Sequence, residues 1–148
     1  MSEPLNLYRL QTLDSLIDKI KRRLNEIDRI LSDNQLIQNA KKEFDKAEAE
    51  AKRIRIKLNQ IADKVEAQRI KRKTTQAALF SGKNKNPKVL QDLQMESEAL
   101  KRYIAQLEDQ QLEAMIANEA AEEELDQARK ALAQAKGTTA EENAALLG

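Results

Sequence analysis

The sequence predicts an all-α protein, a long antiparallel two-helix coiled-coil hairpin. Aromatic residues make up 3% of the 148 residues and charged residues 34%, a composition that favours solvated helices over a broad core. Apolar residues recur at alternating three- and four-residue steps on both sides of one short polar loop, residues 81–87. Because so short a loop forces the helices to be neighbours, they should run antiparallel as a single domain over residues 1–148.

The first helix is expected over about residues 4–81, since Pro4 is tolerated in a first helical turn. Its apolar pattern changes phase by one position at residues 32–34, where Ser, Asp and Asn are poor helix formers. We therefore expect a bend or break near residues 32–36. The stripe before the phase change consists of Leu10, Leu13, Ile17, Ile20, Leu24, Ile27 and Leu31. The stripe after it consists of Ile37, Ala40, Phe44, Ala47, Ala51, Ile54, Leu58, Ile61 and Val65.

The loop and the start of the second helix follow from their capping residues. Gly82 suits the left-handed conformation that follows a helix, so the tip loop is expected over residues 82–86. The second helix should begin with Asn86 as N-cap and Pro87 in the first turn. It is expected to run over about residues 87–136.

A second interruption is expected at residues 137–139, Gly-Thr-Thr, with a short final helix over about residues 139–147. By this arrangement Leu146 and Leu147 return along the first helix near Arg22. Both interruptions would then lie at the same level of the hairpin.

The two apolar stripes agree in one pairing of the helices. Setting Leu79 opposite Leu90 aligns Ile61 with Leu107, and the other apolar positions follow. A few polar residues fall on the same faces, and we interpret them as register control rather than as a partner groove. These residues are Gln68, Arg72, Ser97, Gln111 and Asn118.

The part of the first apolar stripe within residues 5–20 has no counterpart left to cover it, because the second helix ends before it reaches that level. An apolar stripe of about four turns left in water would be sticky. We expect it to contact a second copy, a partner protein or a further C-terminal portion. The candidate contact residues are Leu10, Leu13, Ile17 and Ile20.

Charge is segregated although the formal net charge is only +1. From Ala67 to Gln91 the chain carries basic residues and no acidic one, so the tip is positive. Such a patch suits nucleic-acid phosphates or an acidic protein face, or only keeps the end of a coiled coil solvated. Phe80 is expected to plug the turn rather than to stack on a base. The candidate binding residues are Arg69, Lys71, Arg72, Lys73, Lys83, Lys85 and Lys88.

The sequence contains few side chains that are suited to catalysis. Without Cys or His the chain has no thiolate or imidazole ligand for zinc and no usual proton shuttle. We predict no catalytic residue, no metal site and no cofactor, and therefore no enzyme. No apolar run approaches the roughly 20 residues of a membrane span, and no signal-peptide pattern is present, so a cytoplasmic location is expected.

Two stretches resemble a known family. Residues 79–96, with Ala99 to Arg102 and Leu107 to Asp109, resemble the hairpin tip of the bacterial C4-type zinc-ribbon domain proteins, and residues 7–18 resemble their N-terminus. The resemblance implies a coiled-coil hairpin that is followed, in the family, by a four-cysteine zinc ribbon. It also implies chaperone-like partnership with the alternative sigma factor, support of flagellar or secretion systems, or RNA binding. Because this sequence has no Cys, zinc would require a ribbon that it lacks.

We therefore expect a non-enzymatic adaptor or chaperone-like protein that binds a protein partner through its basic tip and N-terminal stripe. The alternative is an RNA- or DNA-binding protein that uses the same tip. A further alternative is a purely structural or self-associating coiled coil.

Overall fold

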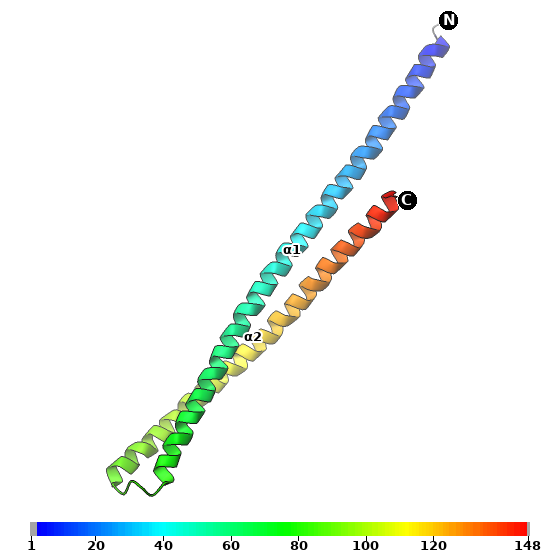
Figure 1. The fold of residues 1–148 in the computed structure, drawn as a ribbon. Coiled ribbons are helices and arrows are strands. Elements are labelled where there is room, and N and C mark those ends of the chain that lie inside the picture. Colours follow the sequence, from blue (N-terminus) through cyan, green and yellow to red (C-terminus); the bar gives the residue numbers. More distant parts are fainter. Residues whose placement is uncertain (1–2, 148) are drawn as a thin grey trace. The chain divides into compact units, whose positions relative to one another are not determined.

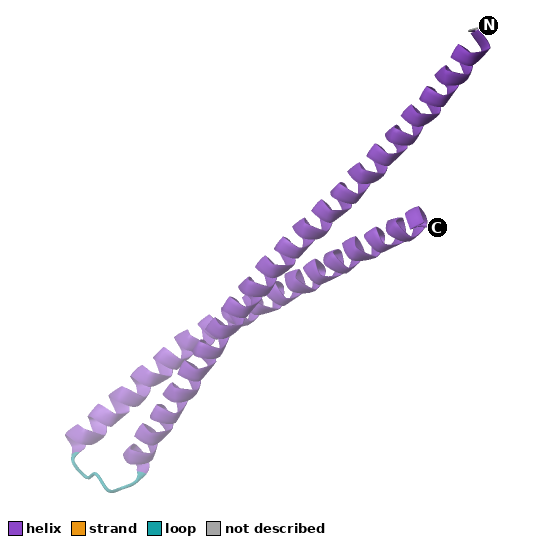
Figure 2. Cartoon of the chain, turned by 45° about the horizontal axis from the view of Figure 1, so that its top comes forward, coloured by secondary structure: helices purple, strands orange, loops and turns teal. Residues whose placement is uncertain are grey.

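A computed structural model describes residues 3–147 as two long helices joined by one loop (Figure 1). Helix α1 spans Glu3–Phe80 and helix α2 spans Pro87–Leu147, and no strand occurs among the described residues. The loop, residues 81–86, separates the helices, as the view coloured by secondary structure also shows (Figure 2). The predicted all-α antiparallel hairpin is confirmed.

The chain divides into two compact units. The loop unit, Lys46–Gln127, contains the end of α1, the loop and the first two thirds of α2. The terminal unit combines Met1–Asp45 with Ala128–Gly148, of which residues 3–45 and 128–147 are described. Each unit brings a segment of α1 together with a segment of α2.

The loop unit is held together by a narrow seam of side chains between the helices. Ile61, Val65 and Leu107 form one buried cluster, and Ala114 packs against it. Ile61 and Leu107, which the sequence sets opposite each other, both belong to this cluster. The ion pairs of Arg69 with Glu108 and of Arg55 with Glu122, however, join residues about one heptad away from the predicted pairing. The buried residues of the unit are Ala51, Ile61, Val65, Thr75, Ser97, Leu100, Ile104, Leu107, Ala121 and Leu125.

The loop forms as its capping residues predict. Gly82 has φ 70°, a left-handed conformation that residues with a Cβ rarely adopt. At the start of α2 the Lys88 backbone N–H donates to Asn86 Oδ1 at 3.0 Å, and the Leu90 N–H donates to the Asn86 carbonyl at 3.1 Å. Asn86 is therefore the N-cap of α2, which confirms the prediction.

Of the predicted bend or break near residues 32–36, the break is wrong, because α1 continues through them. The bend stays a prediction. Half-buried positions follow one seven-residue spacing on both sides of this segment, including Glu26, Asp33, Ala40 and Ala47. The seam therefore keeps its own frame through Asp33, and the helix needs no interruption to preserve it. Once formed, a helix propagates at about one hydrogen bond per residue, which outweighs a few poor formers.

The predicted end of the second helix at residue 136, and with it a separate helix over residues 139–147, is also wrong. Helix α2 runs through Gly137 to Leu147. The Thr139 hydroxyl donates to the Ala135 carbonyl at 2.9 Å, one turn back, so it bonds within the helix instead of capping a new one. The side chains of Leu146 and Leu147, expected near Arg22, lie outside the described residues.

Neither helix contains, within residues 3–147, a stretch long and apolar enough to cross a membrane.

Candidate functional site

The basic residues predicted as a binding patch all lie at the loop end of the loop unit, but they fall into two groups. Arg69, Lys71, Arg72 and Lys73 lie on the last turns of α1. The second group, which we call the loop lysines, consists of Lys83, Lys85 and Lys88. The structure places the two groups in different surroundings.

The α1 group is partly engaged with α2. Arg69 Nη2 contacts Glu108 Oε1 at 2.8 Å across the two helices, and both side chains remain about half exposed. Arg72 lies half-buried in the seam, where its Nε is shielded from solvent and has no hydrogen-bond partner among the described residues. With Lys73 these residues line a hollow of about 280 Å³, whereas Lys71 is exposed and does not line it.

The loop lysines are presented to solvent on a backbone that is held in place. The Ser81 hydroxyl donates to the Ala78 carbonyl at 3.0 Å and accepts a hydrogen bond from the Lys83 backbone N–H at 3.3 Å. The three lysine side chains are exposed, and no ion pair is found for them within residues 3–147. Their positive charge is therefore free to meet a partner.

Phe80 does not plug the turn. It is the last residue of α1, and its side chain is 79% exposed, so the expectation of a buried aromatic residue is wrong. A short helix–helix loop with both ends capped by polar groups has little volume in which to enclose a phenyl ring. The result is an exposed aromatic residue beside three exposed lysines.

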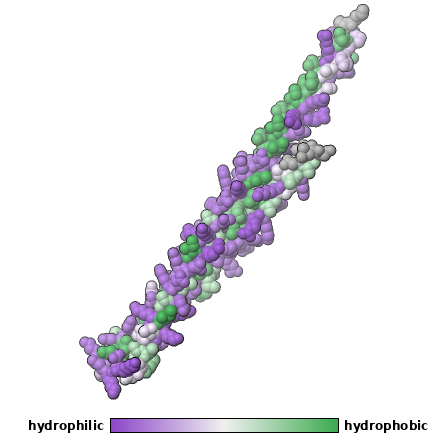
Figure 3. All heavy atoms as spheres, viewed as in Figure 1, coloured by the Kyte–Doolittle hydropathy of each residue, from purple (hydrophilic) through white to green (hydrophobic). Residues whose placement is uncertain are grey.

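The N-terminal stripe, defined as Leu10, Leu13, Ile17, Ile20, Leu24, Ile27 and Leu31, is exposed in the terminal unit. Every described residue from Glu3 to Asn25 is exposed. The stripe side chains themselves are between 43% and 61% exposed. Figure 3 shows the green apolar side chains gathered along this N-terminal stretch of α1. The prediction that residues 5–20 are left uncovered within the chain is confirmed, and the exposure of the stripe extends further, to Leu31.

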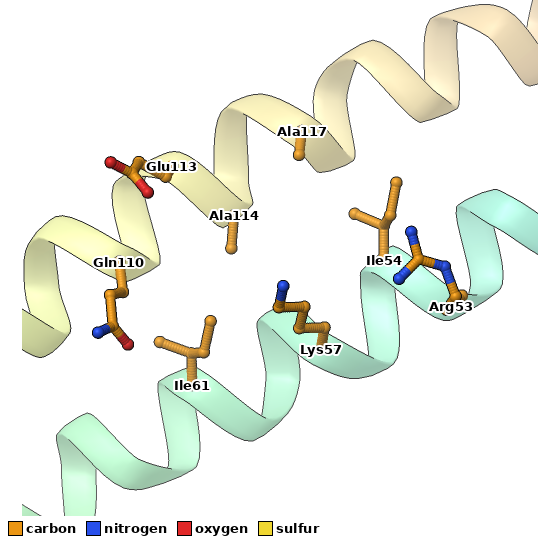
Figure 4. Close-up of a pocket in the computed structure, with 8 residues that line it drawn as sticks. All are labelled: Arg53, Ile54, Lys57, Ile61, Gln110, Glu113, Ala114 and Ala117. Carbon is orange, nitrogen blue, oxygen red and sulfur yellow. The ribbon is translucent and has the colours of Figure 1, made fainter.

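A second hollow, not predicted from the sequence, lies between the helices of the loop unit. Its volume is about 370 Å³, and Ile54 and Ile61 of α1 face Ala114 and Ala117 of α2 across it (Figure 4). The small alanine side chains leave space that larger residues would fill. The alternation of alanine with leucine along the seam is the sequence signal that could have revealed it. Its lining residues are Arg53, Ile54, Lys57, Ile61, Gln110, Glu113, Ala114 and Ala117.

The rim of this second hollow is occupied by a local ion pair. Arg53 donates through Nε to Glu50 Oε2 at 3.1 Å, one turn away on α1. This hydrogen bond holds the pKa of Glu50 below its usual range and raises the pKa of Arg53. Arg53 is thus already satisfied on its own helix, and we assign no ligand to the hollow.

Two carboxyl groups meet in the terminal unit. A hydrogen bond to Asp33, together with desolvation and the charge of Asp33, raises the pKa of Glu142, while the nearby Arg29 partly opposes this. Like charges this close favour a shared proton. No group of three or more potential metal ligands is found within the described part of the chain.

Comparison with known proteins defines the class of this molecule as a coiled-coil hairpin domain. The family model of the CT398-like coiled coil hairpin domain matches residues 10–146, so the chain belongs to that family. No curated protein and no solved structure matches it. The family and the two long packed helices fit a non-enzymatic structural or interaction module.

Proposed function

We propose that the chain is a cytoplasmic adaptor that binds an acidic face of a protein partner through the loop lysines and Phe80. The observation that carries this proposal is the presentation of three unpaired lysines beside a 79% exposed aromatic residue, on a loop fixed by its caps. Aromatic residues are enriched in protein interfaces, where they act as anchors, and the lysines add charge complementarity to an acidic partner. The N-terminal stripe is the second contact surface in this proposal.

The resemblance of the loop and the N-terminus to the bacterial C4-type zinc-ribbon domain proteins narrows the expected partner. That resemblance supports a chaperone-like role toward a transcription factor of the sigma type or toward flagellar or secretion components. No zinc site is proposed within this chain, because it lacks Cys and His.

The rival function is RNA binding through the same loop. Lysines that follow phosphates and an aromatic ring that stacks on a base are the usual elements of single-strand binding. The same exposure of Phe80 and the loop lysines supports this rival, whereas the modest size of the patch and the acidic residues further along α2 favour a protein partner. A purely structural role would leave the loop without any partner.

The test is affinity capture from cytoplasmic extract with the chain and with a variant in which Lys83, Lys85 and Lys88 are changed to Glu. Each capture is run with and without nuclease, bound protein and nucleic acid are both identified, and direct binding of the purified partner is then measured. The matched control changes three exposed α1 lysines far from the loop in sequence, Lys41, Lys42 and Lys52, to Glu.

An adaptor should retain one specific protein with the parent chain and the control, with or without nuclease, and lose it with the loop variant. Nucleic acid that only the parent chain and the control retain would replace this proposal with the rival. Equal capture by all three proteins would overturn the role of the loop lysines, and the absence of any captured partner would leave the structural role.

A further inference from the structure

The N-terminal stripe and the seam occupy different faces of α1. In the terminal unit the half-buried positions of α1 include Glu26, Asp33 and Ile37, and Asp33 meets Glu142 of α2. Leu31 is 61% exposed although it lies between them in sequence. Because each residue turns an α-helix by about 100°, the stripe, one position out of phase with the seam, lies about 100° around the helix from the face that packs against α2. The stripe is therefore a separate coiled-coil surface rather than an extension of the seam.

The stripe has the length and spacing of an independent coiled coil. Its members alternate at three- and four-residue steps over residues 10–31, about three heptads. With Leu10 at position a, the polar residues Asn6 and Asn34 fall at the d positions just outside the stripe. The apolar surface therefore ends at a polar asparagine at each of its two ends.

The charges that flank the stripe are complementary to those of a second copy. Arg9 and Arg23 occupy g positions, and Asp14 and Asp28 occupy e positions. In a parallel, in-register pair, each g residue meets the e residue five positions further along the other chain. Arg9 then meets Asp14 of the second copy and Arg23 meets Asp28 of the second copy, with no pair of like charges.

The other two flanking pairs of the parallel arrangement are also compatible. Leu16 meets Lys21 of the second copy, whose methylene groups can cover it, and Ile30 meets Gln35. Within residues 3–147, one ion pair on the same chain competes for these charges: Arg23 Nη1 lies 3.9 Å from Glu26 Oε2, a long and exposed pair that is worth little.

An antiparallel arrangement satisfies fewer of these charges. In one antiparallel register, in which Leu10 meets Ile27, Asp14 meets Lys21 of the second copy, but Asp28 lies beside Leu7 and both arginines lie beside apolar residues. A shift by one heptad places Asp14 beside Asp28 and Lys21 beside Lys21. The charge pattern therefore favours the parallel arrangement.

We propose that the chain binds a second copy of itself through a parallel, in-register coiled coil of residues 10–31. This inference rests on the proposed role of the N-terminal stripe as a contact surface and names its occupant. It is independent of the loop lysines, which lie in the other unit.

The first experiment is sedimentation of the full chain over a range of concentrations. The parent chain should associate, and a variant with Leu13→Asp and Ile20→Asp should remain monomeric. The matched control changes two exposed apolar residues of the loop unit, Leu112→Asp and Ile116→Asp, and should associate like the parent chain. Circular dichroism of each variant verifies that the helices are intact.

Charge exchange tests the proposed pairs without touching the apolar stripe. One variant carries Arg9→Asp and Arg23→Asp, and the other carries Asp14→Arg and Asp28→Arg. Each alone should associate at least about tenfold more weakly than the parent chain, and their mixture should recover the parent affinity. If the pair were antiparallel, the variant with Arg9→Asp and Arg23→Asp should associate nearly as tightly as the parent chain, because Asp14 and Lys21 are unchanged in it.

Cysteine cross-linking tests the register, because the chain contains no Cys of its own. A disulfide requires Cα atoms about 4.4–6.8 Å apart, so Leu13→Cys should cross-link to itself in a parallel pair. Ser15→Cys, on the opposite face of the helix from the stripe, is the control for random collision. A cross-link between Leu13→Cys and Leu24→Cys chains, in place of the self cross-link, would overturn the parallel register.

The outcomes separate this inference from the role on which it rests. A parent chain that stays monomeric at about 100 μM while an identified protein binds the stripe directly, and loses that binding on Leu13→Asp and Ile20→Asp, would overturn self-association alone. A monomeric chain whose stripe variants lose no binding would overturn both proposals.

Discussion

The seam of the loop unit and the N-terminal stripe use the same apolar pattern on the same helix, yet one is buried and the other is exposed. Val65 in the seam is 2% exposed, whereas Leu10 in the stripe is 55% exposed. The difference lies in α2, which follows the seam and not the stripe. A heptad pattern thus identifies a contact surface, but the identity of its partner comes from elsewhere in the chain or from another molecule.

The sharpest test of this comparison is to remove the same side chain from each surface. Leu107→Ala, in the buried cluster with Ile61 and Val65, should lower the free energy of unfolding by about 2–4 kcal/mol, because it leaves a cavity. Leu13→Ala should change it by less than about 0.5 kcal/mol when measured in urea at concentrations where the chain is monomeric. Equal losses at both positions would show that the stripe is covered within the chain.

Arg72 is a polar residue in the largely apolar seam, and replacing it should raise the free energy of unfolding instead of lowering it. Arg72→Met should raise the free energy of unfolding by about 1 kcal/mol, because it removes a shielded Nε without a partner and keeps the side-chain volume. Lys71→Met, at an exposed neighbouring position, is the control and should leave stability nearly unchanged in the same urea titration. Destabilisation by Arg72→Met would mean that the guanidinium is satisfied in solution.

The ion pair between Arg69 and Glu108 at the edge of the seam should contribute less to the free energy of unfolding than the buried residues do. Glu108→Gln removes the charge that Arg69 contacts and should lower the free energy of unfolding by about 0.5 kcal/mol, since both groups are exposed. The loss should disappear at about 1 M salt, where the screening length is about 3 Å. Glu113→Gln, an exposed acid on α2, should show no such salt-dependent difference from the parent chain.

The carboxyl pair of the terminal unit should make its packing depend on pH. Because Asp33 raises the pKa of Glu142, the stability that this pair contributes is fully present below the ordinary carboxyl pKa of about 4.5. It is lost as the pH rises through the raised pKa of Glu142 in the folded chain. Hydrogen exchange of residues 128–142, corrected for its intrinsic pH dependence, should show more protection at pH 4 than at pH 7.

The matched variant for this pH dependence is Asp33→Asn. It removes the neighbouring negative charge and should return the pKa of Glu142 toward its usual value, as followed by NMR of the Glu142 carboxyl carbon. An unchanged titration of Glu142 in this variant would show that the two groups do not meet in solution.

The features that depend on local chemistry were predictable from the sequence. The heptad spacing predicts that Ile61 and Leu107 are buried in the seam, and Gly82 and Asn86 predict the two ends of the loop. The predicted breaks do not occur, because the unfavourable propensities of Ser32, Asn34 and Gly137 are small beside the continuity of a long packed helix.

The features that depend on three-dimensional packing were not predictable. The exposure of Phe80 depends on how much room the loop encloses, and the hollow at Ala114 depends on side-chain volumes across two helices. The sequence placed the basic residues correctly at the loop end. It could not separate the engaged Arg69 from the free loop lysines, because that distinction rests on the position of Glu108.

The short loop also determines the order in which the loop unit can assemble. Contacts near the loop join residues close in sequence: Arg69 and Glu108 are 39 residues apart, and pairs further from the loop, such as Arg55 and Glu122, are more distant. The entropy lost on closing a chain segment grows with its length, so pairing that starts at the loop and advances one turn at a time is least costly. Tension applied between residues 46 and 127 should separate the same pairs in the reverse order, with the capped loop as the last element to open.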